Sequence, residues 1–155
     1  MSVVLHSARD ADLAVLAALH SACFPEEAWD SAALATVLAM PGAAGRIAID
    51  EAQSISGLLI DQCLGEDAEI LTLCVAPASR RGGVARRLIA DLVIRARALG
   101  AHRILLEVAA DNRPALTLYE AMGFYRQGTR TAYYRRANRP AVDAWRLCLD
   151  LPAAT

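Results

Sequence analysis

A short glycine- and arginine-rich segment lies between an apolar strand and a long amphipathic helix, and it constrains the fold more than any other part of the sequence. The strand covers residues 70–75 and stops before Pro77, and residues 80–85 read Arg-Arg-Gly-Gly-Val-Ala. After them apolar residues recur at close to helical spacing as far as Leu99, and Gly100 is a suitable residue to end a helix. The sequence therefore predicts a strand, a glycine loop and a helix in direct succession.

The glycine loop has the properties of an anion site. Several backbone N–H groups are unpaired at a helix start, and the helix dipole adds partial positive charge there. Gly82 and Gly83 tolerate positive φ and let a phosphate approach the backbone without a Cβ clash. Four nearby arginines add charge: Arg80, Arg81, Arg86 and Arg87. We therefore expect a pyrophosphate ligand, with an ordinary glycine turn and solvated arginines as the alternative. The loop matches neither the Walker pattern nor the dinucleotide pattern.

The rest of the chain is predicted to contain strands and helices in an α/β (α+β) order. Strands are expected over residues 3–8, 45–50, 55–64, 104–108, 124–129 and 145–151, and helices over 10–20, 32–40, 84–99 and 112–122. Asp30 or Ser31 can cap the second helix, and Asn112 can cap the fourth. The Arg- and Tyr-rich residues 130–144 are typical of a functional loop. Since no linker or repeat is visible, residues 1–155 are expected to form a single domain.

Composition and charge narrow the class of protein. Of the 155 residues 55% are hydrophobic and 21% charged, which indicates a globular chain with a core, and the net charge of −1 excludes a uniformly basic nucleic-acid coat. Residues 1–79 carry two arginines against eleven acids, a net of −9, and residues 80–155 carry fourteen arginines against six acids, a net of +8. This asymmetry suggests a charged ligand on one side, unless the fold mixes the two halves.

The cysteines and histidines do not predict a metal site. Cys23, Cys63, Cys74 and Cys148 form no Cys-x-x-Cys pair, and the three histidines are far apart in sequence. The cysteines lie among apolar residues, which favours buried, reduced thiols in a cytoplasmic protein. We expect neither a signal peptide nor a membrane span, because no apolar run approaches 18 residues.

Two motifs resemble those of the GCN5-related N-acetyltransferases. Arg80-x-x-Gly83-x-Ala85 is similar to their [QR]-x-x-G-x-[GA] signature, and Asn112 with residues 115–124 is similar to their N-x-x-A-x-x-L-Y-x-x-x-G-F run. The similarity covers residues 3–151. It implies the fold of that superfamily, a mixed, mostly antiparallel sheet of six or seven strands with about four helices. It also implies that strands 70–75 and 104–108 splay apart and that acetyl-CoA is the cosubstrate, with no metal.

Within the superfamily the chain most resembles the RimI-type ribosomal-protein alanine N-acetyltransferases. The resemblance rests on Cys23-Phe24-Pro25 with Trp29 nearby, on Leu106-Glu107-Val108, and on Arg130-x-x-Tyr133-Tyr134. It implies transfer to the N-terminal alanine of a small-subunit ribosomal protein. The chain departs from the family pattern near the acceptor groove, where Thr72 and Ala132 stand in place of asparagines. A small amine or another protein N-terminus is therefore the alternative acceptor. The alternative to an enzyme is a non-catalytic regulatory module that binds acyl-CoA.

The resemblance assigns cofactor-binding residues. Backbone groups of Leu73, Cys74 and Val75 would pair with the pantetheine arm, and the pyrophosphate would meet Arg80, Arg81, Gly82, Gly83, Val84, Ala85 and Arg86. Asn112 would reach the cofactor as well. Cys74 is not expected to be a nucleophile, because an apolar strand offers nothing to lower its pKa and because the family transfers acetyl directly.

Glu107 and Tyr119 are the candidate catalytic residues. Glu107 ends an apolar strand and could take the proton of the amine through water, unless it only pairs with an arginine. Tyr119 stands in the Leu-Tyr motif and could protonate the leaving thiolate, unless it is only a packed core aromatic. An α-amine with a reference pKa near 7.7–8.0 is partly neutral at cytosolic pH, whereas lysine is not, which favours an N-terminal acceptor.

The acceptor surface is expected at the N-terminal helices and the late loop. Glu26 and Glu27 beside Trp29 would attract a basic N-terminal segment such as a ribosomal protein offers, and Tyr133 and Tyr134 would contact it. No direct contact with nucleic acid or with a membrane is expected.

Overall fold

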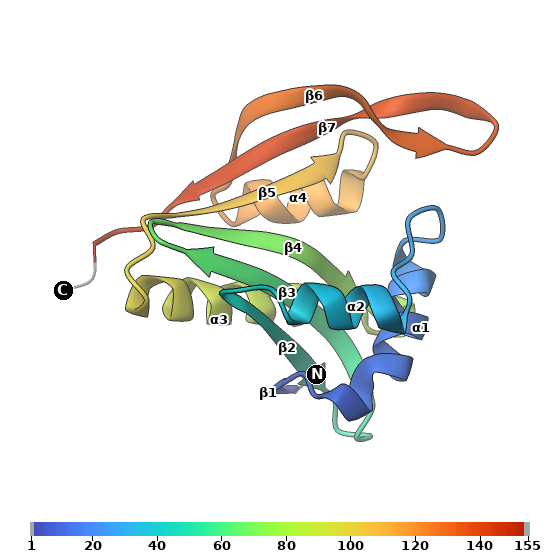
Figure 1. The fold of residues 1–155 in the computed structure, drawn as a ribbon, viewed down its shortest axis with the longest axis vertical. Helices are drawn as coiled ribbons and strands as arrows, with labels where there is room; N and C mark the ends of the chain where they lie inside the picture. Colours follow the sequence, from blue (N-terminus) through green and yellow to red (C-terminus); the bar gives the residue numbers. More distant parts are fainter. Residues whose placement is uncertain (1, 154–155) are drawn as a thin grey trace.

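The computed structural model describes residues 2–153 and forms one twisted sheet with helices on both faces (Figure 1). Its described strands are β1 Val4–Ser7, β2 Ala43–Ile49, β3 Ile55–Leu64, β4 Asp67–Val75, β5 Arg103–Ala109, β6 Tyr125–Arg136 and β7 Arg139–Asp150. Its described helices are α1 Leu13–Cys23, α2 Ser31–Leu38, α3 Val84–Ala98 and α4 Arg113–Ala121, with short 3₁₀ turns at Asp10–Asp12 and Pro77–Ser79.

The strand order confirms the predicted mixed, mostly antiparallel sheet. The seven strands run in the order β1-β2-β3-β4-β5-β7-β6, and all neighbours are antiparallel except β4 and β5. The parallel pair follows from the chain path, because α3 carries the chain from the end of β4 back to the start of β5.

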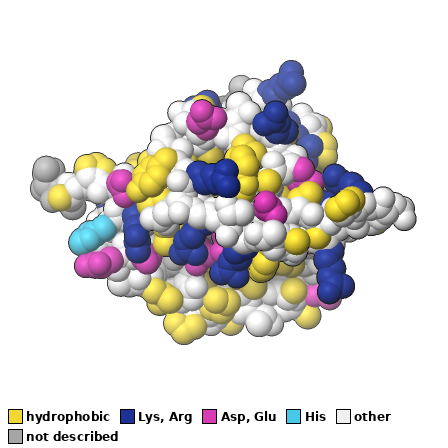
Figure 2. All heavy atoms as spheres, turned by 90° about the horizontal axis from the view of Figure 1, so that it is seen from above, with side chains coloured by type: hydrophobic (Ala, Val, Ile, Leu, Met, Phe, Trp, Pro, Cys, Tyr) yellow, Lys and Arg dark blue, Asp and Glu magenta, His cyan; other side chains and the backbone are white. Residues whose placement is uncertain are grey.

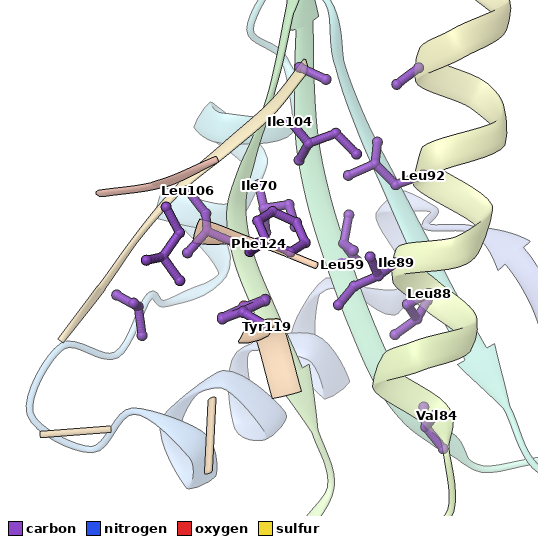
Figure 3. Close-up of a cluster of buried hydrophobic side chains, with 14 of the residues drawn as sticks. Leu59, Ile70, Val84, Leu88, Ile89, Leu92, Ile104, Leu106, Tyr119 and Phe124 are labelled. Carbon is purple, nitrogen blue, oxygen red and sulfur yellow. The ribbon is translucent and has the colours of Figure 1, made fainter. Parts of the chain in front are cut away.

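Two apolar clusters hold the helices on opposite faces of the sheet. In one cluster α3 side chains such as Leu88 and Leu92 point at β3 and β5, and Tyr119 from α4 joins them beside Phe124 (Figure 3). In the other cluster Leu16 of α1 and Leu34 of α2 pack on the reverse face. Strand β3 is buried on both faces as a result, without a break from Ser56 to Asp61.

A bulge in β4 separates the two central strands. Ile60 of β3 pairs with Thr72, but the next residue, Asp61, pairs with Ile70, so Leu71 is an extra residue. The parallel pairing of β4 with β5 stops at the same point, at Ile70 and Leu106. The remaining residues of the two strands diverge, which confirms the expected splay.

Capping side chains mark the starts of α2 and α4. Asp30 Oδ1 accepts the Ala33 N–H at 2.8 Å at the start of α2, and Asn112 Oδ1 accepts the Ala115 N–H at 3.3 Å at the start of α4. The prediction for the first helix was wrong by one turn. The Asp12 carboxylate accepts the Arg9 N–H at 2.9 Å and holds a 3₁₀ turn, so α1 begins only at residue 13 and extends to residue 23.

The prediction of a loop over residues 130–144 was also wrong. Strands β6 and β7 continue through this region as a long hairpin, and only residues 137 and 138 connect them. Asn138 has φ +59°, a value that asparagine tolerates in tight turns. Ala132, at φ +51°, donates its N–H to Asp143 Oδ1 at 2.8 Å where the ladder is irregular. Most side chains of β6 are exposed, so this strand has no apolar alternation to reveal it.

Candidate functional site: the cleft between β4 and β5

A cleft of about 1030 Å³ opens where β4 and β5 diverge. Its walls come from the middle of β4, the second half of β5, the start of α4, the segment between α1 and α2, and the tip of the β6–β7 hairpin. Figure 1 shows the hairpin reaching over the α1–α2 segment. Segments far apart in the sequence therefore meet at this point of the sheet.

Glu107 lies on β5, one residue beyond the last pair with β4, and lines the cleft. Its side chain is 17% exposed, and its Oε1 lies 2.9 Å from Arg130 Nε and 3.7 Å from Arg146 Nη1. Arg146 is also its cross-strand neighbour on β7. Glu107 thus pairs with arginines and also lines the cleft, so both interpretations of this residue apply. The carboxylate is still partly exposed to the cleft, so a water molecule or an amine can reach it.

Tyr119 belongs both to the core and to the cleft. Its ring packs edge-on against Phe124, with centroids 5.4 Å apart, and the residue is 6% exposed (Figure 3). Its hydroxyl has no partner within residues 2–153 and is not among their buried unpaired atoms, so it has access to the cleft. Burial raises the pKa of Tyr119 above its ordinary value, which keeps the phenol protonated.

The glycine loop presents a row of free N–H groups. Gly83 is the N-cap of α3 with φ +82°, and a Cβ added there would meet no atom within 4 Å. The first helical hydrogen bond runs from Arg87 N to Gly83 O at 3.0 Å. Within residues 2–153 no acceptor contacts the N–H groups of residues 81–86. This arrangement can hold an anion such as a phosphate, although the loop does not line the cleft itself.

Arg80 differs from the other arginines of the loop. Its Nε donates to Val75 O at 3.4 Å, and its Nη2 lies 3.8 Å from Cys23 Sγ. The side chain therefore points back to the end of β4 and joins that strand to α1.

The other expected cofactor residues lie along the free edge of β4 and at the start of α4. Leu73, Cys74 and Val75 pair with β3 on one side only, because β5 has already turned away. Their other edge is open to an extended ligand. Asn112 lines the cleft, although its Oδ1 is occupied by the cap of α4.

The acidic residues expected to attract the acceptor already have a partner. Arg136 on the hairpin contacts Glu27 at 2.9 Å, Glu26 at 3.5 Å and Asp111 at 3.0 Å, with its side chain only 10% exposed. Arginine and acidic side chains are also interspersed on the β6–β7 side of the molecule (Figure 2). The fold therefore mixes the two halves of the sequence, as the alternative interpretation of the charge asymmetry anticipated.

The three aromatic residues expected at the acceptor surface all line the cleft. The indole ring of Trp29 stacks on the His20 ring, with centroids 4.8 Å apart. The backbone N–H of Trp29 donates to His20 Nδ1 at 3.0 Å. Tyr133 is 51% exposed, whereas Tyr134 is half-buried beside it. Burial raises the pKa of Tyr134 to about 12.

Sequence reasoning missed the buried His20 as part of this site. Its Nε2 lies 3.1 Å from Thr72 Oγ1, so it links α1, β4 and the backbone of Trp29. Because Nδ1 accepts a hydrogen bond, Nε2 carries the proton, and burial lowers the pKa of the ring. The only hint in the sequence is its position one helical turn before Cys23.

The sequence profile described as the acetyltransferase (GNAT) family matches residues 14–124. This chain belongs to the acetyltransferase (GNAT) family. Among curated proteins, the GNAT domain is 43% identical over 67 residues to the N-alpha-acetyltransferase RimI of Mycobacterium tuberculosis, which covers 43% of this chain and 40% of that protein. It is 31% identical over 83 residues to the ribosomal protein bS18-alanine N-acetyltransferase of Salmonella typhimurium, and this match covers 54% of this chain and 56% of that protein. The matches thus span less than two thirds of these relatives.

Solved structures show that the GNAT fold extends over nearly the whole chain. The ribosomal-protein-S18-alanine N-acetyltransferase of Escherichia coli superposes with a TM-score of 0.89 at 22% identity, covering 99% of this chain and 97% of that one. Arabidopsis thaliana NAA60, solved with a bisubstrate analogue, superposes with a TM-score of 0.86 at 21% identity, covering 99% of this chain and 100% of that one. A phosphinothricin acetyltransferase of Sinorhizobium meliloti, solved with AcCoA, superposes with a TM-score of 0.82 at 22% sequence identity. The superposition covers 97% of this chain and 89% of that one.

Within residues 2–153 no helix has the length and apolar character to span a bilayer. In the same part of the chain no three His, Cys, Asp or Glu side chains come together as a metal site would need.

Proposed function

We propose that this GNAT protein is an acetyl-CoA-dependent N-acetyltransferase that passes the acetyl group directly to an amine. The observation that carries the proposal is the splay of β4 from β5. The splay opens a cleft that Glu107 and Tyr119 both line. Strand β4 runs from this cleft toward the free N–H groups of residues 81–86. A thioester, an amine and two proton-transfer groups can meet in such a cleft.

The cofactor would lie along the free edge of β4. Backbone groups of residues 73–75 would pair with the pantetheine amides as an added strand does, and one N–H would polarise the acetyl carbonyl. The pyrophosphate would then reach the N–H groups of residues 81–86 at the start of α3. Arg80 would keep the strand end in place rather than bind phosphate, since it is committed to Val75 and Cys23.

Glu107 would act as the general base and Tyr119 as the general acid. An α-ammonium gives up its proton easily near neutral pH, so a carboxylate acting through one water molecule suffices. The part of the Glu107 carboxylate that is exposed to the cleft suits that role. The phenol of Tyr119 remains protonated in its buried setting and would protonate the leaving thiolate.

We propose a protein N-terminus as the acceptor, in particular an N-terminal alanine of a small-subunit ribosomal protein in the cytoplasm. Support comes from the relatives that are named for this activity and from the likeness to NAA60. The cleft also has the two walls that an entering peptide requires, the α1–α2 segment and the tyrosine-bearing hairpin. A small amine is the second candidate, which the likeness to phosphinothricin acetyltransferases supports.

Release of the CoA thiol by the purified protein tests the proposal. The acceptors are a peptide with a free N-terminal alanine, the same peptide with a blocked N-terminus, the same blocked peptide with one lysine, and phosphinothricin. Rapid thiol release with the free N-terminus alone supports the proposed acceptor, and release with phosphinothricin alone supports the small amine. CoA binding by calorimetry without thiol release for any acceptor would indicate a non-catalytic acyl-CoA-binding module.

A further inference from the structure

Cys23 and Cys74 form a pair of facing thiols at the edge of the cleft. His20 and Cys23 are one turn apart on α1, and Thr72 and Cys74 are two residues apart on β4. Since His20 Nε2 lies 3.1 Å from Thr72 Oγ1, the same register brings Cys23 opposite Cys74. Cys23 Sγ donates to Val75 O at 3.3 Å, Cys74 Sγ lies 3.8 Å from Thr72 Oγ1, and both thiols pack in the apolar cluster that holds α1 on the sheet.

The two thiols have opposite environments. Cys23 is half-buried, lines the cleft and has Arg80 Nη2 at 3.8 Å, whereas Cys74 is 1% exposed. The hydrogen bond with Cys74 and the charge of Arg80 lower the pKa of Cys23 to about 6, although burial opposes them. The pKa of Cys74 is raised by the same hydrogen bond and by burial. An accessible thiolate beside a protected thiol is the arrangement of a peroxide-reactive cysteine and its resolving partner.

We propose that Cys23 is a site of oxidation by peroxides and that Cys74 resolves it to a disulfide. The Cys23 thiolate attacks one oxygen of hydrogen peroxide, so that an S–O bond forms, the O–O bond breaks and the departing hydroxide leaves as water after taking up a proton. The Cys74 sulfur then attacks the sulfenic sulfur. An S–S bond forms, the S–O bond breaks, and the thiol proton leaves with the hydroxide as a second water. The peroxide is reduced and the two thiols are oxidised.

The disulfide would join the end of α1 to β4 at the cofactor edge. Cys74 is one of the three residues whose backbone is proposed to bind pantetheine, and the disulfide would include the Cys23 sulfur that Arg80 Nη2 contacts at 3.8 Å. Acetyl transfer should therefore fall in the oxidised protein and return with a thiol reductant. This consequence rests on the proposed function, but the disulfide itself is detected without any assay of activity.

The test is treatment of the full chain with stoichiometric hydrogen peroxide, followed by peptide mapping under non-reducing conditions. The expected product is one intramolecular Cys23–Cys74 disulfide, reversible by dithiothreitol. Cys74→Ala should instead accumulate a sulfenic acid on Cys23 that dimedone traps, and Cys23→Ser should leave Cys74 reduced. Cys63→Ser is the matched control, because the pKa of Cys63 is raised to about 11 by burial and the nearby Asp61 carboxylate, and it should form the disulfide at the wild-type rate.

Several results would overturn the proposal. A wild-type map in which Cys63 or Cys148 oxidises as fast as Cys23 would do so, as would sulfenic acid on wild-type Cys23 that never resolves. Because the wild-type map needs no variant, misfolding of Cys74→Ala would leave the test intact. If the disulfide forms but no acceptor is acetylated, the proposed function fails and the oxidation site stands.

Discussion

Charged neighbours decide what several residues of the cleft can do. The Glu107 carboxylate lies 2.9 Å from Arg130 Nε and 3.7 Å from Arg146 Nη1, so two positive charges act on it. Cys23 has a single cation, Arg80, within reach, and the nearby His20 is held by two hydrogen bonds in its neutral form. Such contacts join α1, β4, β5 and β7, which are distant in the sequence, and no motif of the chain specifies them.

The reactivity of Cys23 should reveal the effect of Arg80. Because the pKa of Cys23 is lowered to about 6, its alkylation by iodoacetamide should rise with pH and level off above pH 7, when the thiolate is fully formed. Arg80→Gln removes the cation and should move the midpoint upward by about one pH unit. The measurement is the alkylation rate from pH 5 to 9 by mass spectrometry. An unchanged midpoint in Arg80→Gln would contradict this view.

At the scale of elements, the glycine loop and the start of α3 make the cofactor prediction testable. Gly83→Val forces a branched side chain into φ +82° and into the space left for a phosphate, so CoA affinity should fall by about tenfold or more. Gly100→Val is the matched control at the other end of α3, with φ +86° and equally open space. Both variants should lose similar stability, but only Gly83→Val should lose CoA affinity by calorimetry. Equal CoA affinity in the two variants would remove the phosphate site from the loop.

A buried ion pair anchors α3 on the sheet. Asp61 on β3, with a side chain 1% exposed, accepts a hydrogen bond from Arg95 Nη2 at 2.8 Å. Asp61→Asn keeps the shape and removes the charge, so the free energy of unfolding should fall by about 1–3 kcal/mol in urea titrations. Asp67→Asn breaks an equally short but exposed pair with Arg103 and should change stability very little. Equal losses in the two variants would show that burial of the pair is unimportant.

The elements also show how far sequence reasoning reaches. Patterns of apolar residues and capping side chains such as Asp30 and Asn112 are local, so α2, α3, α4 and β3 are predicted nearly to the residue. The bulge at Leu71 is not local. Its position depends on the pairing with β3, and the alternating burial along β4 continues through it without a break. The outer half of the β6–β7 hairpin was missed for a related reason, because its mostly exposed side chains carry no apolar period.

At the scale of the whole molecule, Arg136 ties three distant segments together over the cleft. It contacts the α1–α2 segment through Glu27 and the β5–α4 connection through Asp111. Glu26 and Glu27 were identified from the sequence as an open acidic surface, but the fold supplies their counter-charge internally. This wall of the cleft therefore depends on a contact between residues 109 positions apart in the sequence.

Removal of this contact should loosen the acceptor side and leave the cofactor side unchanged. Arg136→Met should raise KM for the acceptor peptide by about three- to tenfold and speed hydrogen exchange in the hairpin tip, with CoA affinity unaltered. Arg135→Met removes the same charge from an exposed neighbour and should have neither effect. If both variants raise KM equally, net charge rather than the contact controls acceptor binding.

The central claim is that Glu107 and Tyr119 transfer protons in the cleft between β4 and β5. The most direct test measures kcat for acetyl transfer to an N-terminal alanine peptide, together with CoA affinity, in Glu107→Gln and Tyr119→Phe. Both changes keep shape and remove proton transfer, so each kcat should fall by about 10²–10⁴-fold while CoA binds as in the wild type. Near-full turnover in either variant would contradict the account, returning Glu107 to a structural ion pair or Tyr119 to the core.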